Sequence, residues 1–423
     1  MDNNSSYYKV ASHEAQKGGV KKCVLLYSGG LDTSIMLKWL QDEYKVEVVA
    51  LTIDIGQQAD DLEEIKQKAI KLGAVEAIVA DCKKEYAEQY VDKAILANAS
   101  YMGDYHLSTP IGRPLLAKVA VEVAHKTGAD CVGHGCTGKG NDQVRIESSV
   151  LCYDPNMKII APVREWSMGR NELIDYAHKH NIPVKQTKDI PYSWDDNVWG
   201  VTGEGGEIED PVEIPKLKEI LQICNMPEDA PDSKALVKIA FEQGVPVAVD
   251  GKKMPLLEVI QALNTVGAEH AIGYTHLIED RIIGMKVRGV YENPGAHILV
   301  NSHKKLEQLV CTKEENRLKE HMDITWAQLC YDGKWLDPAM NHVNNFNINI
   351  NEKVTGEVTC SLYKGKLDVV AIDSKNSLID MDIATFDRNL NFNQNASAAF
   401  IEHYSLGMRL FSRKNMSGKS ANE

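Results

Sequence analysis

The sequence predicts an α/β protein in which a parallel-sheet domain is followed by an α+β domain and a C-terminal arm. Three observations support this prediction. From residue 22, short apolar runs alternate with segments of helical periodicity, as in parallel sheets with crossover helices. Near Pro183 this alternation gives way to hairpin-like patterns. From Asn393 to the end, large apolar side chains recur in a segment too long to be a frayed terminus.

These changes of pattern divide the 423 residues into four parts. Residues 1–20 are polar and lack an apolar signal core, so we expect a loosely ordered extension. Residues 21–183 form the parallel-sheet domain and residues 184–389 the α+β domain. Residues 390–423 form a tail that we expect to dock on a neighbouring subunit.

Five strands and four helices with defined bounds are expected in the first domain, in addition to the helices that follow the glycine-rich segments beginning at Ser28 and Gly133. The strands lie at 23–27, 46–54, 74–80, 129–133 and 157–163, and the helices at 60–73, 86–97, 114–128 and 171–180. Because ligands gather at the carboxyl ends of parallel strands, the loops after Tyr27, Asp54 and Gly133 should meet in one crevice.

The second domain has a less regular pattern. Residues 184–235 are rich in Pro, Gly and acidic residues, and we expect an irregular segment of functional importance there. A hairpin around Gly244, helices near 255–267, 296–309 and 313–330, and strands between 352 and 372 should follow.

Composition narrows the function classes. A net charge of −13 argues against a large nucleic-acid interface. The nine cysteines are scattered, without CxxC or histidine pairing, which indicates a reduced cytoplasmic protein with no structural metal site. No apolar run reaches the roughly 18–20 residues needed to span a bilayer, so no membrane partner is expected.

The most informative motif is Ser28-Gly29-Gly30-Leu31-Asp32-Thr33-Ser34, which follows an apolar run ending at Tyr27. Glycines let the backbone approach a ligand closely, and the free N–H groups of the following helix suit an anion. The hydroxyls of Ser28, Thr33 and Ser34 can donate hydrogen bonds to phosphate oxygens. The Asp32 carboxylate can cap the helix or hold a cation. An ordinary capped turn is the alternative, but caps seldom need two consecutive glycines. The motif resembles the SGGxD[ST] loop of enzymes that split ATP between its α- and β-phosphates.

A second glycine-rich loop runs from Gly133 to Glu147. It formally matches a dinucleotide fingerprint and the start of a Walker A loop, but a lone fingerprint is weak and Gly140 replaces the Walker Ser/Thr. The loop could be a surface turn. Its short polar side chains suit an amino-acid ligand better, and Arg145 can hold a carboxylate through two hydrogen bonds.

Both loops together resemble argininosuccinate synthases. Further landmarks are Asp54-Ile55-Gly56-Gln57, Ile160-Ala161-Pro162, Arg164-Glu165-Trp166, Pro191-Tyr192-Ser193, Glu279-Asp280-Arg281 and Gly284-Met285-Lys286-x-Arg288-Gly289-Val290-Tyr291. The resemblance covers residues 21–411. It implies an adenine nucleotide alpha hydrolase-like first domain, a synthetase second domain and a cytoplasmic homotetramer. It also implies an ATP- and Mg²⁺-dependent ligase that joins citrulline to aspartate through a citrullyl-adenylate, releasing AMP and pyrophosphate.

The resemblance also implies residue roles. ATP would be bound by Tyr27, Ser28, Gly29, Gly30, Leu31, Asp32, Thr33, Ser34, Ile53 and Gly135. Aspartate would be bound by Thr137, Asn141 and Asp142. Citrulline would be bound by Tyr105, Asn141, Arg145, Ser193, Thr202, Glu279 and Tyr291. The catalytic assignments are Asp32, Asn141 and Arg145.

Two positions depart from the family pattern. Pro110 stands where members often place a small residue that contacts citrulline, and Thr109 beside it is the candidate substitute. Thr202 stands where serine is common. Without the family, Tyr105 and Tyr291 could be half-buried structural tyrosines, and Glu279 could form a surface ion pair with Arg281.

Four alternative functions are open for the whole chain. They are an inactive nucleotide-binding paralogue, an enzyme for a related ureido or amide acid, an amidotransferase-linked synthetase and a tRNA-thiolating enzyme. An inactive paralogue would be expected to have lost the loop glycines, Asp32 or Arg145, and all of these are present. An amidotransferase-linked synthetase would need a glutaminase domain, and the segment before residue 21 is too short for one. The unpaired cysteines and the net charge of −13 argue against a tRNA-thiolating enzyme.

Overall fold

The computed structural model describes residues 8–58, 61–166, 168–183, 191–384 and 392–419. The chain divides into a large unit, Met1–Asn376, and a small unit, Ser377–Glu423, and each is described by itself. The expected start of a helix at Asp60 lies outside the described residues, and so does part of the expected irregular segment, residues 184–190.

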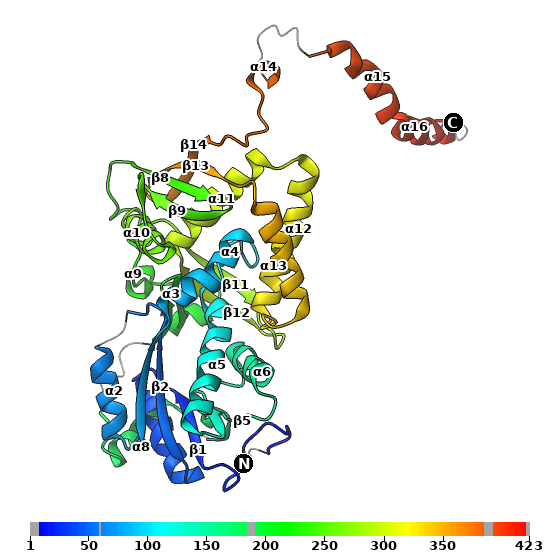
Figure 1. Ribbon diagram of the computed structural model, residues 1–423. Helices are drawn as coiled ribbons and strands as arrows, with labels where there is room; N and C mark the ends of the chain where they lie inside the picture. The colour runs from blue at the N-terminus through cyan, green and yellow to red at the C-terminus, as the bar shows by residue number, and fades with distance from the viewer. Residues whose placement is uncertain (1–7, 59–60, 167, 184–190, 385–391, 420–423) are drawn as a thin grey trace. The chain divides into compact units, whose positions relative to one another are not determined.

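The first sheet is parallel and five-stranded, with the order β3-β2-β1-β4-β5, which confirms the predicted class of the first domain (Figure 1). Its strands are β1 (Lys22–Leu26), β2 (Glu47–Asp54), β3 (Glu76–Asp81), β4 (Cys131–Gly133) and β5 (Lys158–Ile160). In the central strand β1, Val24 is in register with Val49 of β2 and Val132 of β4. Side chains on both faces of β2 are buried, as its continuous apolar sequence requires.

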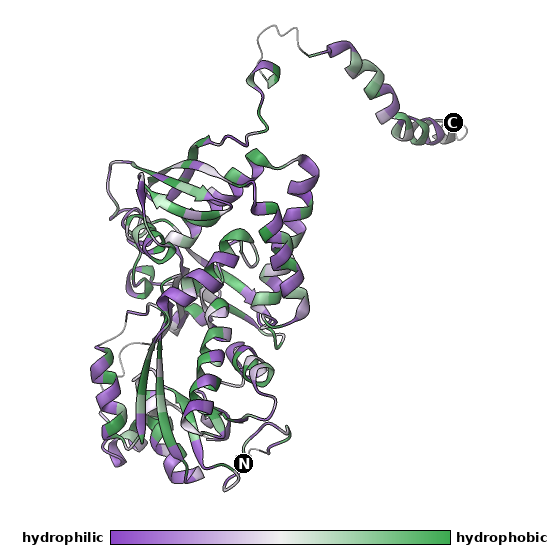
Figure 2. Ribbon diagram, in the orientation of Figure 1, coloured by the Kyte–Doolittle hydropathy of each residue, from purple (hydrophilic) through white to green (hydrophobic). Residues whose placement is uncertain are grey.

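Helices cross over between these strands, and α7 and α8 follow the last strand. They are α1 (Leu31–Trp39), η1 (Leu40–Tyr44), α2 (Leu62–Lys71), α3 (Lys83–Tyr86), η2 (Ala87–Val91), α4 (Asp92–Leu96), α5 (Ser108–Thr127), α6 (Asp142–Tyr153), α7 (Pro162–Glu165) and α8 (Arg170–Lys179). In Figure 2 the strands β1 and β2 are mainly hydrophobic, whereas the helix α2 beside them is mixed, consistent with one solvent-facing side.

Helix α5 begins earlier than predicted. Pro114 was expected at its start, but the helix begins at Ser108 and continues through Pro114. Other elements stabilise the additional turn, since the Ser108 carbonyl accepts hydrogen bonds from Tyr86 and Asn197, and the Thr109 amide donates to the Tyr105 hydroxyl. Tertiary contacts therefore outweigh the local preference for a proline at the first turn.

The segment expected to be irregular contributes two strands to a sheet of order β11-β12-β7-β6. The four strands of this sheet are β6 (Tyr192–Asn197), β7 (Gly200–Gly205), β11 (Tyr274–Asp280) and β12 (Lys286–Glu292), of which β6 and β7 come from the segment. Along the chain, β7 is followed by η3 (Gly206–Glu209) and α9 (Leu217–Ile220). The prediction was wrong here because the strands are rich in Gly, Asp and Asn, which have low β-propensity. Gly200 is needed for close packing, because a Cβ atom there would lie 1.8 Å from Asn293 Nδ2.

The second antiparallel sheet has the order β10-β9-β8-β13-β14 and includes the predicted hairpin at Gly244. Its strands are β8 (Ala235–Glu242), β9 (Val245–Val249), β10 (Lys252–Lys253), β13 (Gly356–Tyr363) and β14 (Lys366–Asp373). The accompanying helices are α10 (Leu256–Glu269), α11 (Pro294–Val310), α12 (Lys313–Tyr331) and α13 (Pro338–Asn351). Helix α13 was not predicted, because its asparagine-rich sequence has weak helix propensity.

The N-terminal segment is more ordered than expected. The Ala15 side chain is 1% exposed, and Glu14 forms a parallel β-bridge with Ile159 of β5. The backbone bonds are Ala15 N to Ile159 O at 2.9 Å and Ile159 N to His13 O at 2.9 Å. The expectation of a loosely ordered extension therefore does not hold for this part of the segment, which backbone pairing stabilises despite its polar composition.

The small unit contains α14 (Met381–Ala384), α15 (Gln394–Tyr404) and α16 (Leu406–Lys419). Helices α15 and α16 carry exposed apolar side chains, among them Phe400, Tyr404 and Phe411. Of the nine cysteines, all within the described residues and all free, Cys152 is exposed and Cys136 is partly exposed. No helix in the described ranges is long and apolar enough to cross a membrane.

Candidate active site

Two cavities lie at the carboxyl ends of the first sheet, as the loop positions predicted. The first has a volume of about 560 Å³ and is bounded by the loop after β1. The second has a volume of about 280 Å³ and is bounded by the loop after β4. Arg113 on α5 lines the first cavity and forms a hydrogen bond with Asp142, which lines the second. The two cavities therefore share a wall.

Backbone geometry builds the first cavity. Gly29 has a φ of +77°, and a Cβ atom on it would lie 2.9 Å from Ile65 Cγ1, so glycine is required on both counts. Gly30 caps α1 without a side-chain hydrogen bond among the described residues, so the first N–H groups of the helix remain available to an anion. The capped-turn alternative for this motif does not describe the geometry.

Side chains around the loop hold it in shape. Ser34 Oγ donates to the Gly30 carbonyl at 2.7 Å and lies 3.1 Å from the Tyr27 hydroxyl, while Ser28 Oγ lies 3.2 Å from Thr33 Oγ1. Lys68 on α2 donates to the Gly29 carbonyl at 2.6 Å, which places an ammonium group beside the loop. The sequence pattern gave no signal for Lys68, because it lies on a separate helix.

Most of the predicted nucleotide-binding residues line the first cavity. These are Tyr27, Ser28, Gly29, Gly30, Leu31 and Ile53. Asp32, Thr33 and Ser34 lie in the first turn of α1 and are not among the described residues that line it. Gly135 lines the second cavity instead. Ile55, Leu62, Ile65 and Leu116 add apolar walls suited to a heterocyclic base.

The second cavity is built from side chains of both domains. The predicted residues that line it are Tyr105, Thr109, Gly135, Thr137, Asn141, Asp142, Arg145, Thr202, Glu279 and Tyr291. Cys136, Gly140, Glu204 and Arg281 also line it and were not predicted. Ser193 is exposed on β6, where it pairs with Glu204, and is not among the described lining residues. Glu279 is 5% exposed, so a surface ion pair does not describe it.

Two arginines set the charge of this cavity. Arg145 Nη1 donates to Asp142 Oδ1 at 2.9 Å, and Arg113 Nη2 donates to Asp142 Oδ2 at 2.8 Å. Burial alone would raise the pKa of Asp142, but the two guanidinium charges and their hydrogen bonds hold it well below its usual range. Asp142 is therefore a carboxylate at neutral pH.

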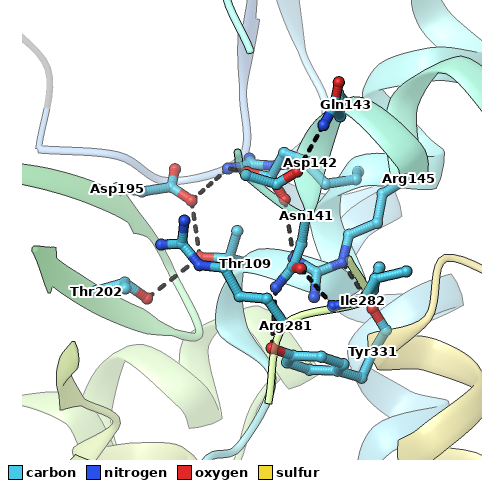
Figure 3. A network of polar contacts seen from close by, with 12 residues as sticks. Thr109, Asn141, Asp142, Gln143, Arg145, Asp195, Thr202, Arg281, Ile282 and Tyr331 are labelled. Carbon is cyan, nitrogen blue, oxygen red and sulfur yellow. Dashed lines mark hydrogen bonds and ion pairs between the residues drawn. The ribbon is translucent and has the colours of Figure 1, made fainter. Parts of the chain in front are cut away.

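The same network crosses the wall between the cavities (Figure 3). Arg113 also pairs with Asp195, which lines the first cavity. Thr109 Oγ1 donates to Asp195 Oδ2 at 2.7 Å and lies 3.2 Å from Thr202 Oγ1. Sequence reasoning missed Arg113 and Asp195, since their importance depends on contacts between segments 82 residues apart.

Two polar atoms on fully buried residues of the second cavity retain unused hydrogen-bonding capacity. In the part of the chain that the structure describes, neither Arg145 Nη2 nor the Tyr291 hydroxyl has a hydrogen-bond partner. Both residues are buried, and an unsatisfied buried polar group costs about 1–3 kcal/mol. A ligand with a carboxylate or carbonyl group would satisfy both.

Comparison with known proteins identifies the family. Residues 22–183 match the argininosuccinate synthase N-terminal HUP domain, and residues 192–411 match the argininosuccinate synthase C-terminal domain. The chain belongs to the argininosuccinate synthase family.

Relatives from distant organisms match nearly full length. Argininosuccinate synthase of Rubrobacter xylanophilus is 43% identical, with 94% of this chain and 96% of the relative covered. The Symbiobacterium thermophilum enzyme is also 43% identical, and the match covers 92% of this chain and 97% of that enzyme. The chloroplastic enzyme of Arabidopsis thaliana is 42% identical, covering 93% and 80%. A solved U34-tRNA thiolase from Methanococcus maripaludis aligns with 41% of this chain and 60% of its own at 17% identity, and its TM-score of 0.26 is too low to bear on fold or activity.

The departures from the argininosuccinate synthase pattern can now be placed. Pro110 is buried in α5 and is not among the described residues of the second cavity, whereas its neighbour Thr109 lines it. Thr202 also lines the cavity, and its hydroxyl faces that of Thr109. Thr109 and Thr202 therefore contribute a pair of neighbouring hydroxyls to the second cavity.

Proposed function

We propose that the protein joins citrulline to aspartate using ATP and releases argininosuccinate, AMP and pyrophosphate. The observation that carries this proposal is the wall shared by the two cavities. One cavity has the anion-binding loop and apolar walls suited to ATP, and the other has the buried charges suited to amino acids. Arg113 and Asp195 belong to the wall, so groups bound on either side could meet there.

Two displacement steps account for the reaction. The ureido oxygen of citrulline attacks the α-phosphorus of ATP, the bond to the bridging oxygen breaks, and pyrophosphate leaves. The amine of aspartate then attacks the ureido carbon of the citrullyl-adenylate. AMP leaves with the former ureido oxygen, and the amine loses a proton. No protein residue needs to form a covalent bond.

The residues divide among three tasks. The amides of Gly29 and Gly30, with the hydroxyls of Ser28 and Thr33, would stabilise the leaving pyrophosphate, which is an electrostatic effect. Ser34, whose hydroxyl donates to the Gly30 carbonyl, would support the loop from behind. Arg145 and Tyr291 would bind citrulline through their unused polar atoms, together with Tyr105, Thr109, Thr202 and Glu279. Thr137, Asn141 and Asp142 would hold aspartate for attack, which is chiefly an effect of orientation.

We propose Mg²⁺ as a companion of ATP. This ion commonly binds through one or two carboxylates together with substrate phosphates. Asp32 is exposed in the first turn of α1, immediately after the anion-binding glycines, and is the carboxylate placed for this role. The ion would supply positive charge to the phosphates as the leaving group departs.

We also propose a cytoplasmic homotetramer in which residues 390–423 contact neighbouring subunits. The support is the set of exposed apolar side chains on α15 and α16, since such patches usually mark interaction surfaces. Nucleic acid is not proposed as a partner, because the net charge is −13.

Pyrophosphate release tests the proposal. The purified protein is incubated with ATP, Mg²⁺, citrulline and aspartate, and each substrate is omitted in turn. Release that requires citrulline, with argininosuccinate and AMP forming when aspartate is present, is the expected result. ATP binding without citrulline-dependent release would indicate an inactive paralogue, and release with another ureido acid alone would indicate a different substrate.

A further inference from the structure

Tyr331, at the end of α12, connects predicted substrate-binding residues from both domains. Its side chain is 1% exposed, and its hydroxyl lies between two of them. Asn141 Nδ2 donates to this hydroxyl at 2.9 Å, and the hydroxyl donates to Glu279 Oε2 at 2.8 Å. Asn141 is the N-cap of α6 and Glu279 lies on β11, so one hydroxyl connects the two domains.

The remainder of Tyr331 contacts Arg145. Its carbonyl accepts a hydrogen bond from Arg145 Nε at 2.8 Å, and the guanidinium carbon lies 4.8 Å from the centre of its ring. The ring of Tyr101 stacks on that of Tyr331 with centres 3.7 Å apart and an interplanar angle of 4°. These contacts fix the direction in which the Tyr331 hydroxyl points (Figure 3).

These bonds determine which polar atoms remain for a ligand. Asn141 Oδ1 accepts from the Ile282 amide at 2.9 Å, so the side-chain amide has one orientation, and its second N–H has no partner among the described residues. Burial raises the pKa of Tyr331, so its hydroxyl stays protonated and can donate to Glu279. Because Oε2 of Glu279 takes this bond, Oε1 remains available to a substrate.

We propose that Tyr331 is a positioning residue, which orients Asn141, Glu279 and Arg145 toward the second cavity. Tyr331 is not among the described residues that line the cavity, so it acts through these three side chains rather than by touching substrate. The inference rests on the proposed function, because it assigns the three side chains to citrulline and aspartate. It gives helix α12 of the second domain a part in the site.

The test is Tyr331→Phe with Tyr44→Phe as the matched control. Tyr44 is equally buried, at 1% exposure, and its hydroxyl donates to Glu165 at 2.7 Å. Neither Tyr44 nor Glu165 is among the described residues that line the second cavity. We expect Tyr331→Phe to raise the KM for citrulline and for aspartate about tenfold, the size expected for losing a hydrogen bond to a charged group, and to leave the KM for ATP within about twofold. Tyr44→Phe should leave all three KM values unchanged. Tm is measured for both variants.

A double-mutant cycle with Glu279→Gln identifies the route of the effect. If Tyr331 acts through Glu279, the two substitutions together should raise the KM for citrulline less than the product of their separate effects. Multiplicative effects would overturn the proposal, and so would unchanged KM values for both amino acids in Tyr331→Phe. A wild-type protein that forms no argininosuccinate would instead refute the proposed function, so the two failures are distinguishable.

Discussion

The two cavities are built in different ways. The first takes its anion-binding part from seven consecutive residues, 28–34, and depends on the backbone conformation of that loop. The second takes its side chains from α5, α6, β7, β11, β12 and the loops beside them, and depends on a buried network of charges. The first cavity should therefore be sensitive to changes in backbone freedom, and the second to the loss of single polar groups.

The largest effect is expected from Arg145→Lys. Lysine keeps the charge but cannot provide the separate bonds to Asp142 and the Tyr331 carbonyl while leaving a third nitrogen for substrate. We expect kcat/KM for citrulline to fall roughly 100- to 1,000-fold, corresponding to about 3–4 kcal/mol. Steady-state kinetics measure the loss. A fall of less than about tenfold would mean that charge alone suffices in the second cavity.

A smaller effect is expected from Gly29→Ala. The left-handed φ of +77° costs an L-residue about 1–2 kcal/mol, and the new methyl group would meet Ile65. We expect the KM for ATP to rise roughly tenfold while the KM for citrulline changes little. Gly18→Ala is the control, because Gly18 has a φ of +78° with nothing within 4 Å of the added Cβ. Equal kinetic effects of the two variants would contradict the backbone interpretation.

Thr202→Val tests a single hydroxyl of the second cavity. The substitution removes the group that lies 3.2 Å from Thr109 Oγ1 but preserves the side-chain shape. We expect the KM for citrulline to rise about two- to tenfold, the size of one neutral hydrogen bond. Thr202→Ser keeps the hydroxyl and should retain the wild-type value. An equal loss in the serine variant would assign the effect to packing instead.

Glu147 provides a test of stability rather than of activity. It accepts a hydrogen bond from His134, at the start of the second loop, and pairs with Arg164 at 2.6 Å. Burial raises the pKa of Glu147, but the bonds and charges of His134 and Arg164 lower it to about 2. A lowered pKa means that Glu147 stabilises the fold above its ordinary pKa, and that this contribution is lost as the pH falls toward about 2.

Denaturant unfolding of Glu147→Gln checks this sign. At pH 7 the variant should be less stable than the wild type by about 1–3 kcal/mol, because a charge-assisted bond is replaced by a neutral one. The difference should shrink as the pH falls from about 4.5 toward 2, because the unfolded chain takes up a proton at Glu147 while the folded carboxylate is still ionised. A difference that stays constant with pH would show that ionisation of Glu147 is not the cause.

The contrast between a cavity built from consecutive residues and one built from separate elements explains which features the sequence could predict. The first loop was predictable because its chemistry lies in consecutive residues after an apolar strand. The parallel sheet was predictable from its alternating pattern. Strands β6 and β7 were not, because pairing of β7 with β12 and of β6 with β7, rather than β-propensity, stabilises them.

Single residues of the second cavity were predictable only through the family resemblance. Glu279 and Tyr291 carry no local signal, and their proximity to Arg145 arises from the fold. Arg113 and Tyr331 were missed, since their importance comes from bonds to residues far along the chain. Ser193 matches the family motif but lies outside the described lining, so its role stays a prediction.

The cysteine distribution has a practical consequence for spectroscopy. Cys152 is the exposed thiol, and burial raises the pKa of the partly exposed Cys136, which suppresses its reactive thiolate form. A maleimide dye should therefore attach selectively to Cys152 at neutral pH. Cys152 lies on α6 about 10 Å along the helix axis from Arg145, at the rise of roughly 1.5 Å per residue. The native chain thus offers a fluorescent reporter on the helix that carries Asp142 and Arg145, without any engineered cysteine.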